Sequence, residues 1–261
     1  MIDQHSSAYA FQHYKERARQ LITTNAFSTV CEIGGGRSPL FTDKEIAELR
    51  LEYTILDISE DELAAAPSYC LKVRGDICVR DPGARSGQYD FMFSRLVAEH
   101  VSSASAMHRN IFQLLQPGGL AFHFFPTLFT PAFVVNRVLP EHVAQRLLLA
   151  FWPSRRTIHQ KFPARYSKCF GPTSPMKRFI RNLGYEVEEY RAFYGTGYLA
   201  RIPVLRSVES FISVTAARRL GPWFSSYAWL LVRKPPSVKT VRKDSWRAAS
   251  ANSGQVVSHN R

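Results

Sequence analysis

The stretch VCEIGGGRS, residues 30–38, joins a short apolar run to an acid and three consecutive glycines. An apolar run of this length is typical of a buried strand in a parallel sheet. The glycines after it allow a tight turn and a close approach of the backbone to a ligand. Glycine turns also serve as plain connectors between a strand and a helix. The stretch therefore predicts a strand over 27–33 that ends at a turn, and it leaves the role of that turn open.

A second acid follows at a spacing typical of nucleotide-binding sheets. Asp57 lies near the end of the strand-like run 53–58, and it stands 57 − 36 = 21 residues after Gly36. In doubly wound sheets, an acid about 20 residues beyond the glycines contacts the ribose hydroxyls of the ligand. The turn and the acid together predict a nucleotide-containing ligand more specifically than either feature does alone.

Strands and helices are expected to alternate along most of the chain. This alternation predicts an α/β fold in which a doubly wound, mostly parallel sheet is covered by helices on both faces. Further strands are expected at 71–78, 89–94, 120–125, 184–190 and 227–233, and helices at 6–24, 40–50, 105–115 and 174–183, with a helix-like segment at 141–152.

Two more segments complete a pattern that resembles a known family. Gly75-Asp76-Ile77 ends the third expected strand, and LLQPGGL, residues 114–120, precedes the fifth. With the glycine turn and Asp57, these segments resemble the class I S-adenosylmethionine-dependent methyltransferases, of type 11 or 12, over residues 28–126. The resemblance implies a Rossmann-like, seven-stranded sheet with an antiparallel last strand. It also implies S-adenosyl-L-methionine as the cofactor.

The same resemblance assigns roles to the strand ends. The acid and glycines of the first turn would hold the methionine part of the cofactor, the second acid its ribose, and the G-D-I segment its adenine. A nicotinamide cofactor is the alternative on this architecture, but it predicts a third glycine where Ser38 stands. The cofactor-binding residues predicted in this way are Glu32, Gly34, Gly35, Gly36, Asp57, Ile58, Asp76, Ile77 and Ser94.

The sequence says less about which residues bind the methyl acceptor. Methyl transfer to a hydroxyl needs a base near the methyl group, and we consider His100 and His123 as candidates. His100 also fits a packing role beside the cofactor, and His123, which alternates with phenylalanines, also fits a strand histidine with satisfied hydrogen bonds. No metal-ligand cluster is visible in the sequence. The polar residues that would face either an acceptor or solvent are His159, Arg165 and Tyr166.

The chain divides into an N-terminal helix (1–26), a methyltransferase domain (27–236) and a basic tail (237–261) that we expect to be disordered. Helical cap insertions are expected at 127–172 and 194–224, where family members place acceptor-binding segments. The acceptor is therefore not inherited from the fold.

Positive charge is concentrated in the second half of the chain. Residues 1–120 hold 12 Lys and Arg and 15 acids, whereas residues 121–261 hold 22 and 6. Apolar and aromatic residues with basic neighbours recur at 138–152 and 198–224, which suits either a lid over the cleft or contact with an anionic membrane. Nucleic acid ranks lower as a partner, because no N-P-P-Y motif of exocyclic-amine methylation follows the fourth strand.

These observations favour an S-adenosylmethionine-dependent methyltransferase that acts at oxygen on a small-molecule, lipid-linked or sugar-linked acceptor. A nucleic-acid methyltransferase and a non-catalytic cofactor-binding scaffold of the same fold are the alternatives. The four cysteines form no C-x-x-C pair, and no apolar run approaches the roughly 18 residues needed to cross a bilayer. We therefore expect a cytoplasmic protein. Peripheral contact with the inner face of a membrane is the alternative to test.

Overall fold

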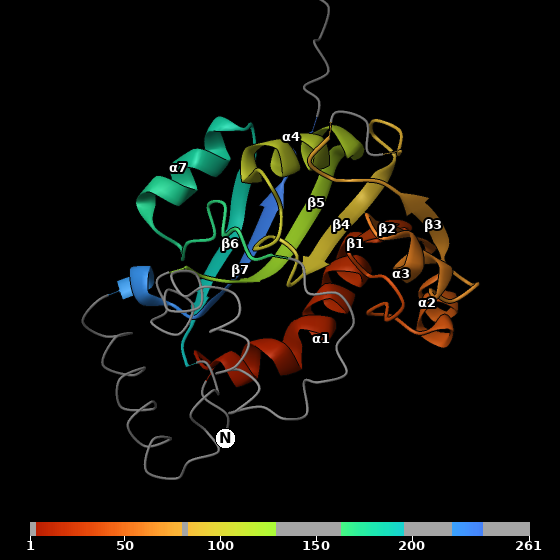
Figure 1. Cartoon of the computed structure of the whole chain (residues 1–261), viewed down its shortest axis with the longest axis horizontal. Helices are drawn as coiled ribbons and strands as arrows, with labels where there is room; N and C mark the ends of the chain where they lie inside the picture. The colour runs from red at the N-terminus through yellow and green to blue at the C-terminus, as the bar shows by residue number, and fades with distance from the viewer. Residues whose placement is uncertain (1–3, 80–82, 129–162, 196–220, 237–261) are drawn as a thin grey trace, which may run out of the picture.

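The computed structural model describes residues 4–79, 83–128, 163–195 and 221–236, which contain one seven-stranded sheet (Figure 1). The strands are β1 Thr29–Ile33, β2 Glu52–Asp57, β3 Leu71–Arg74, β4 Tyr89–Arg95, β5 Leu115–Pro126, β6 Glu186–Phe193 and β7 Tyr227–Arg233. Their order across the sheet is β3-β2-β1-β4-β5-β7-β6. The pairs among β1 to β5 are parallel, and β7 is antiparallel to both β5 and β6. The predicted α/β fold with an antiparallel last strand is confirmed.

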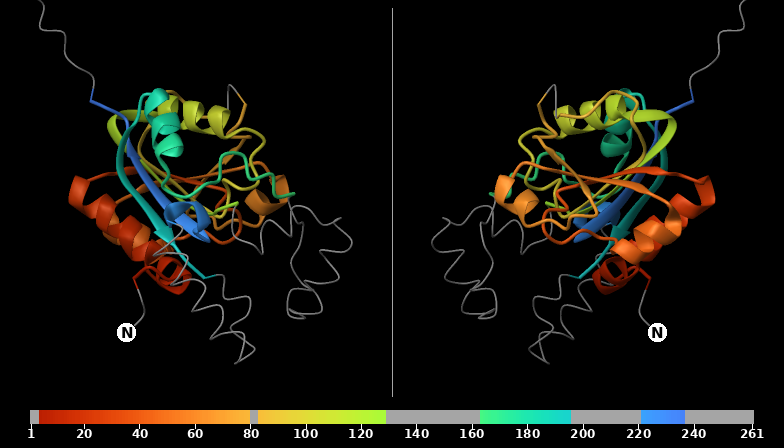
Figure 2. Two further views of the ribbon diagram at one scale, coloured as in Figure 1. Left: turned by 90° about the vertical axis from the view of Figure 1, so that its left-hand side faces the viewer. Right: turned by 90° about the vertical axis from the view of Figure 1, so that its right-hand side faces the viewer.

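Helices cover both faces of the sheet. Figures 1 and 2 show α1 on one face and α4 and α7 on the opposite face. None of the helices in the described ranges combines the length and the apolarity that crossing a bilayer requires. The helices are α1 Ser7–Asn25, α2 Asp43–Leu49, α3 Glu60–Ala64, α4 Ala104–Leu114 and α7 Ser174–Asn182, with a 3₁₀ turn η2 at Gly221–Phe224.

The third strand is shorter than predicted, for a local reason. It ends at Arg74 instead of residue 78. The carboxylate of Asp76 accepts the backbone N–H of Cys78 at 2.8 Å, and the Asp76 carbonyl accepts that of Val79 at 3.0 Å. These bonds turn the chain out of the sheet directly after Gly75.

Two further differences concern the fifth strand and a short helix. The strand begins at Leu115 instead of Leu120, because Leu115 pairs with Tyr89 ahead of a register shift. The helix α3 was not predicted, since five residues are too few to show a helical period. Its first turn is rich in acids and follows Ser59, whose hydroxyl accepts the N–H of Glu62. The helix-like segment predicted at 141–152 lies outside the described residues.

The first helix is fixed to the sheet by a buried tyrosine. Tyr14 stacks on Phe122 with ring centres 4.8 Å apart. Its hydroxyl lies 2.9 Å from the carbonyl oxygen of Ser94 on β4 and 3.1 Å from that of Phe122 on β5. One side chain therefore ties α1 to two neighbouring strands at the centre of the sheet, where burying an aromatic ring stabilises the fold most.

Side-chain alternation along β5 sends the next residue, His123, to the opposite face. There it meets His108 of α4 at a ring-centre distance of 5.3 Å, and its Nδ1 lies 2.8 Å from the hydroxyl of Ser94. Burial lowers the pKa of His123 well below its usual value and that of His108 to about 4. Both rings are therefore neutral at physiological pH.

We expect this pair to make folding sensitive to acid. A histidine with a depressed pKa in the folded state binds fewer protons there than in the unfolded chain. The free energy of unfolding should therefore fall as the pH drops from about 6.5 to about 4, by up to about 1.4 kcal/mol per pH unit for each ring. Denaturant titrations between pH 4 and 8 measure this slope.

The variant His108→Phe keeps an aromatic ring against Phe179 and Tyr185 and removes one titrating group. Its stability should depend less steeply on pH than that of the wild type. Parallel curves for the two proteins would contradict the assignment.

Candidate functional site

The carboxyl ends of the central parallel strands meet at one edge of the sheet, where they border a pocket of about 360 Å³. Parallel sheets of this kind place their ligands at this edge. His100 and Arg165 border the pocket beside the cofactor residues predicted from the sequence, whereas Glu32, Gly35, Gly36 and Ser94 do not line it. The predicted cofactor residues that do line it are Gly34, Asp57, Ile58, Asp76 and Ile77.

The glycine turn after β1 has no room for a side chain where it borders the pocket. Gly34 has a φ of +72°, and its N–H donates to the carbonyl of Leu56 at 2.8 Å. A Cβ at Gly34 would lie 2.5 Å from Cγ2 of Val97, which is closer than any relaxed contact. Glycine is therefore required here both for its conformation and for its lack of volume.

Hydrogen bonds to the side chain of Glu32 hold this turn in place. Its carboxylate accepts the backbone N–H of Leu40 at 2.9 Å and the hydroxyl of Tyr53 at 2.5 Å. A Cβ at Gly35 would lie 2.8 Å from its carboxyl carbon. Burial raises the pKa of Glu32, and the two hydrogen bonds oppose that rise. Glu32 thus positions the turn in this structure and does not itself border the pocket.

Asp57 ends β2 with its carboxylate held by backbone groups. Burial raises its pKa, and hydrogen bonds from the N–H groups of Ser59, Gly36 and Ile58 oppose this rise. The bond from Ser59 is 2.9 Å long. Three backbone donors orient the carboxylate at the pocket, where its remaining lone pairs can accept further hydrogen bonds.

Apolar side chains flank the two acids. Ile58 is 53% exposed, which is unusual for a large aliphatic residue beside a buried strand end. Ile77 is buried and follows Asp76, whose carboxylate holds the turn after β3. A pocket with two acids between aliphatic walls suits a ligand that carries both hydroxyls and a flat apolar ring.

The segment after β4 contributes four pocket residues that the sequence analysis did not assign, namely Leu96, Val97, Val101 and Ser102. Leu96 has a φ of +58°, and its N–H donates to the carbonyl of Phe124 at 2.8 Å. Val97 packs over Gly34. The strand register could have indicated them, because Ser94 pairs with Ile33 and the next residues must lie beside the glycine turn.

The two candidate bases occupy different places. His100 borders the pocket, and its Nδ1 lies 3.3 Å from the carbonyl oxygen of Pro163. His123 is buried on the α4 face, bonded to the hydroxyl of Ser94, and does not line the pocket. Because strand alternation turns His123 and Ser94 toward α4, only His100 remains a candidate base.

The residues predicted to bind the acceptor also lie in different places. Arg165 is exposed at the pocket, whereas Tyr166 is buried. Both donate their backbone N–H to the carbonyl of Glu99, at 2.7 and 2.9 Å. His159 lies outside the described residues, as do most of the two predicted insertions.

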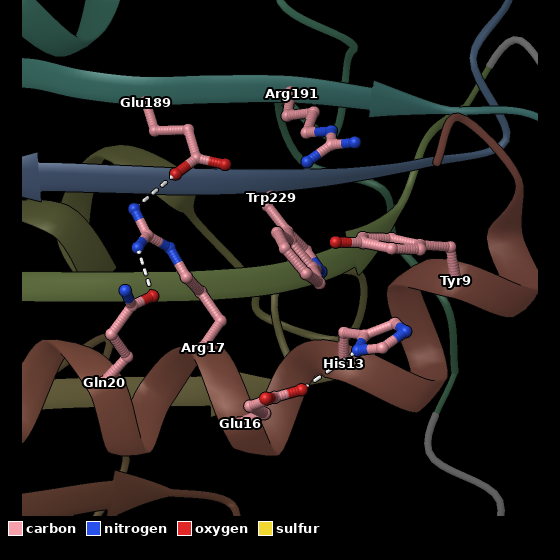
Figure 3. A pocket seen from close by; sticks show the side chains of 8 residues that line it. All are labelled: Tyr9, His13, Glu16, Arg17, Gln20, Glu189, Arg191 and Trp229. Atoms are coloured by element: carbon pink, nitrogen blue, oxygen red, sulfur yellow. Dashed lines mark hydrogen bonds and ion pairs between the residues drawn. The ribbon is translucent and has the colours of Figure 1, made fainter. Parts of the chain in front are cut away.

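A second hollow, of about 700 Å³, lies between α1 and the strands β6 and β7 (Figure 3). Most of its charged side chains bond to one another, whereas Arg191 donates to the backbone carbonyl of Gln4 at 2.6 Å. Arg17 bonds to Glu189 at 2.9 Å and to Gln20 at 2.8 Å, and His13 bonds to Glu16 at 3.0 Å. The bond between Arg17 and Glu189 ties α1 to the edge strand. The two pockets share no lining residue among those described.

Comparison with known families agrees with this geometry. The family model of the methyltransferase domain matches residues 5–190, which is well over half of the chain. A search of curated proteins found no match.

Solved structures with the same fold include several methyltransferases. A protein assigned as a sarcosine dimethylglycine methyltransferase from Galdieria sulphuraria is 13% identical, with a TM-score of 0.51 over 86% of each chain. Phosphoethanolamine N-methyltransferase 2 of Haemonchus contortus, in complex with S-adenosyl-L-methionine, is 15% identical, with a TM-score of 0.50 over 84% of this chain and 52% of that one.

The cyclase SpnF has the same fold, at 13% identity and a TM-score of 0.52 over 86% of this chain and 82% of that one. At these identities the likeness shows the fold alone. The fold is therefore compatible with more than one reaction and does not transfer an acceptor to this chain.

The glycine turn generates a direct test. We expect Gly34→Ala to weaken S-adenosylmethionine binding at least about tenfold, because the added methyl group must displace Val97. Gly118→Ala is the matched control, since Gly118 also has a positive φ, of +86°, but has nothing within 4 Å of an added Cβ. Isothermal calorimetry measures both. Equal affinities for the two variants would show that the contact with Val97 is irrelevant to the cofactor.

Proposed function

The chain belongs to the S-adenosylmethionine-dependent methyltransferases, and on that premise we propose that it methylates a hydroxyl of a small-molecule, lipid-linked or sugar-linked acceptor. The observation that carries the proposal is the position of His100. It is the candidate base that borders the cofactor pocket, and its side chain is 34% exposed. A hydroxyl acceptor requires such a group, whereas an already nucleophilic acceptor does not.

The residues at the strand ends fit the cofactor. When bound, S-adenosylmethionine supplies a methyl group on a positively charged sulfur. The backbone at Gly34, which has no space for a side chain, would lie against the methionine part. Asp57, oriented by three backbone donors, would hold the ribose hydroxyls, and Asp76 with Ile77 would cap the adenine.

The contacts of His100 support its role as a proton acceptor. A carbonyl oxygen only accepts hydrogen bonds, so the contact between Nδ1 and Pro163 favours the tautomer with the hydrogen on Nδ1. In that tautomer Nε2 is the basic nitrogen, which would take the proton of an acceptor hydroxyl. Because the ring is partly exposed, it can pass that proton to solvent.

Mass spectrometry can identify the acceptor by the mass of the transferred methyl group. Cofactor with an isotopically labelled methyl group is incubated with the protein and with lipid and small-molecule extracts, and the products are compared by mass spectrometry. The proposal expects one compound to gain a methyl group on oxygen. Label on nitrogen or carbon would refute the proposed acceptor class, and label on nucleic acid would favour the alternative.

With the acceptor in hand, we expect His100→Gln to lower kcat by about 100-fold or more, because a general base contributes roughly that factor. Cofactor affinity should change little. His13→Gln, in the separate hollow between α1 and the strands β6 and β7, is the matched control and should keep wild-type turnover. An unchanged kcat in His100→Gln would remove His100 as the base.

We also propose that the rim of the cleft contacts an anionic membrane. The strand β7 is antiparallel to β5, so η2, just before β7, lies at the same edge of the sheet as the pocket. Its Trp223 and Phe224 are each 42% exposed. These two residues belong to the strongly basic half of the chain. Exposed aromatic side chains combined with positive charge are typical of proteins that bind the surface of acidic membranes.

Vesicle flotation tests this contact. The wild type should float with vesicles that contain phosphatidylglycerol and not with vesicles of phosphatidylcholine alone, and added salt should weaken the binding. The double variant Trp223→Ser with Phe224→Ser should lose most of it. Leu71→Ser with Val79→Ser, which removes two exposed apolar side chains elsewhere, is the control. Equal flotation of both double variants would argue against the proposal.

A further inference from the structure

The side chain of Glu99 is buried beside the cleft, and within the described part of the chain one of its two carboxyl oxygens has no hydrogen-bond partner. Glu99 follows β4 and is only 5% exposed. Among the described residues, its Oε2 has no hydrogen-bond partner. Burying a carboxyl oxygen without a hydrogen bond is unfavourable, so the described residues give no structural reason for an acid at this position instead of a leucine or methionine.

The backbone of Glu99 has a separate, structural task. Its carbonyl accepts the N–H groups of Arg165 and Tyr166, which anchors the segment 163–170 over the end of β4. Any residue could provide that carbonyl. The backbone contacts therefore leave the acidic side chain unexplained.

The titratable groups beside this carboxyl group come from two segments. On its own segment, Oε1 of Glu99 lies 3.8 Å from Nε2 of His100. On the facing segment, burial raises the pKa of the Cys169 thiol, and the nearby Glu99 charge raises it further. Arg165 and Tyr166 reach Glu99 through their backbone N–H groups.

Burial raises the pKa of Glu99 to about 8. The acid therefore holds its proton through the neutral range and loses it in the mildly alkaline range. An ionised Glu99 would stabilise a proton on the neighbouring imidazole, whereas a protonated one would not. Two groups this close titrate as a pair.

We propose that Glu99 is a positioning residue that forms a proton-sharing pair with His100, so that the pair acts as one base toward the acceptor hydroxyl. This inference rests on the proposed role of His100. As the acceptor oxygen forms its bond to the methyl carbon, the carbon–sulfur bond breaks and sulfur keeps the electron pair. The hydroxyl proton moves to Nε2 of His100, and the Glu99 carboxylate balances the imidazolium charge until the proton leaves to solvent.

The pH dependence of kcat/KM tests the pair in turnover. In the wild type, kcat/KM should rise through the mildly alkaline range as Glu99 ionises. Glu99→Gln should flatten this rise and lower kcat/KM at pH 9 by about tenfold or more, with unchanged cofactor affinity. Glu99→Asp should restore part of the rise. Glu16→Gln, the same change in the exposed pair with His13, should leave the profile unaltered.

A second measurement does not depend on turnover. NMR titration of the His100 ring should show an inflection in the mildly alkaline range, where Glu99 ionises beside it, and this inflection should be absent in Glu99→Gln. A changed His100 titration without methyl transfer would support the pair and refute the proposed reaction. An unaltered His100 titration, or an unaltered pH profile with a lower melting temperature, would show that Glu99 is only structural.

Discussion

A single buried carboxylate, that of Glu32, holds the turn on which the cofactor site is built. Its hydrogen bonds to Leu40 and Tyr53 join both ends of the segment after β1 to the neighbouring strand. Gly35 lies directly on this carboxyl group, and Gly34 is brought against Val97. A shift of Glu32 would therefore move the backbone that faces the ligand. The cost of burying the acid is offset by the two hydrogen bonds it accepts, which is the condition under which buried polar groups stabilise a defined geometry.

The two faces of the sheet and the edge at which its parallel strands end have different roles. Along β5, alternating side chains place Phe122 and Phe124 against α1 and His123 against α4. Both faces are occupied by packing, so ligands are left with the edge where the parallel strands end. Asp57, Asp76 and His100 reach one pocket for this reason, although each of them comes from the end of a different strand.

The cleft has two chemically different sides. The cofactor side is built from the slightly acidic first half of the chain, with oriented carboxylates and small aliphatic walls. The other side begins where Glu99 anchors the segment 163–170 and brings Arg165 to the pocket. The strongly basic second half of the chain follows from there. The net charge of +13 thus belongs mainly to the part of the molecule from which we expect acceptor recognition.

From the sequence alone, one could predict the alternation of strands and helices, the glycine turn and the acids that end β2 and β3, because hydrophobic period, glycine spacing and charge are local properties. The same reasoning could not decide which of His100 and His123, or of Arg165 and Tyr166, reaches the pocket, since the direction of a side chain depends on the segments packed around it. The tertiary structure separated them by direction: strand alternation buried His123, and the bonds to the Glu99 carbonyl left Arg165 exposed while Tyr166 is buried. It also revealed that the acid of Glu99 is buried beside His100, because burial arises only when segments far apart in the chain pack together.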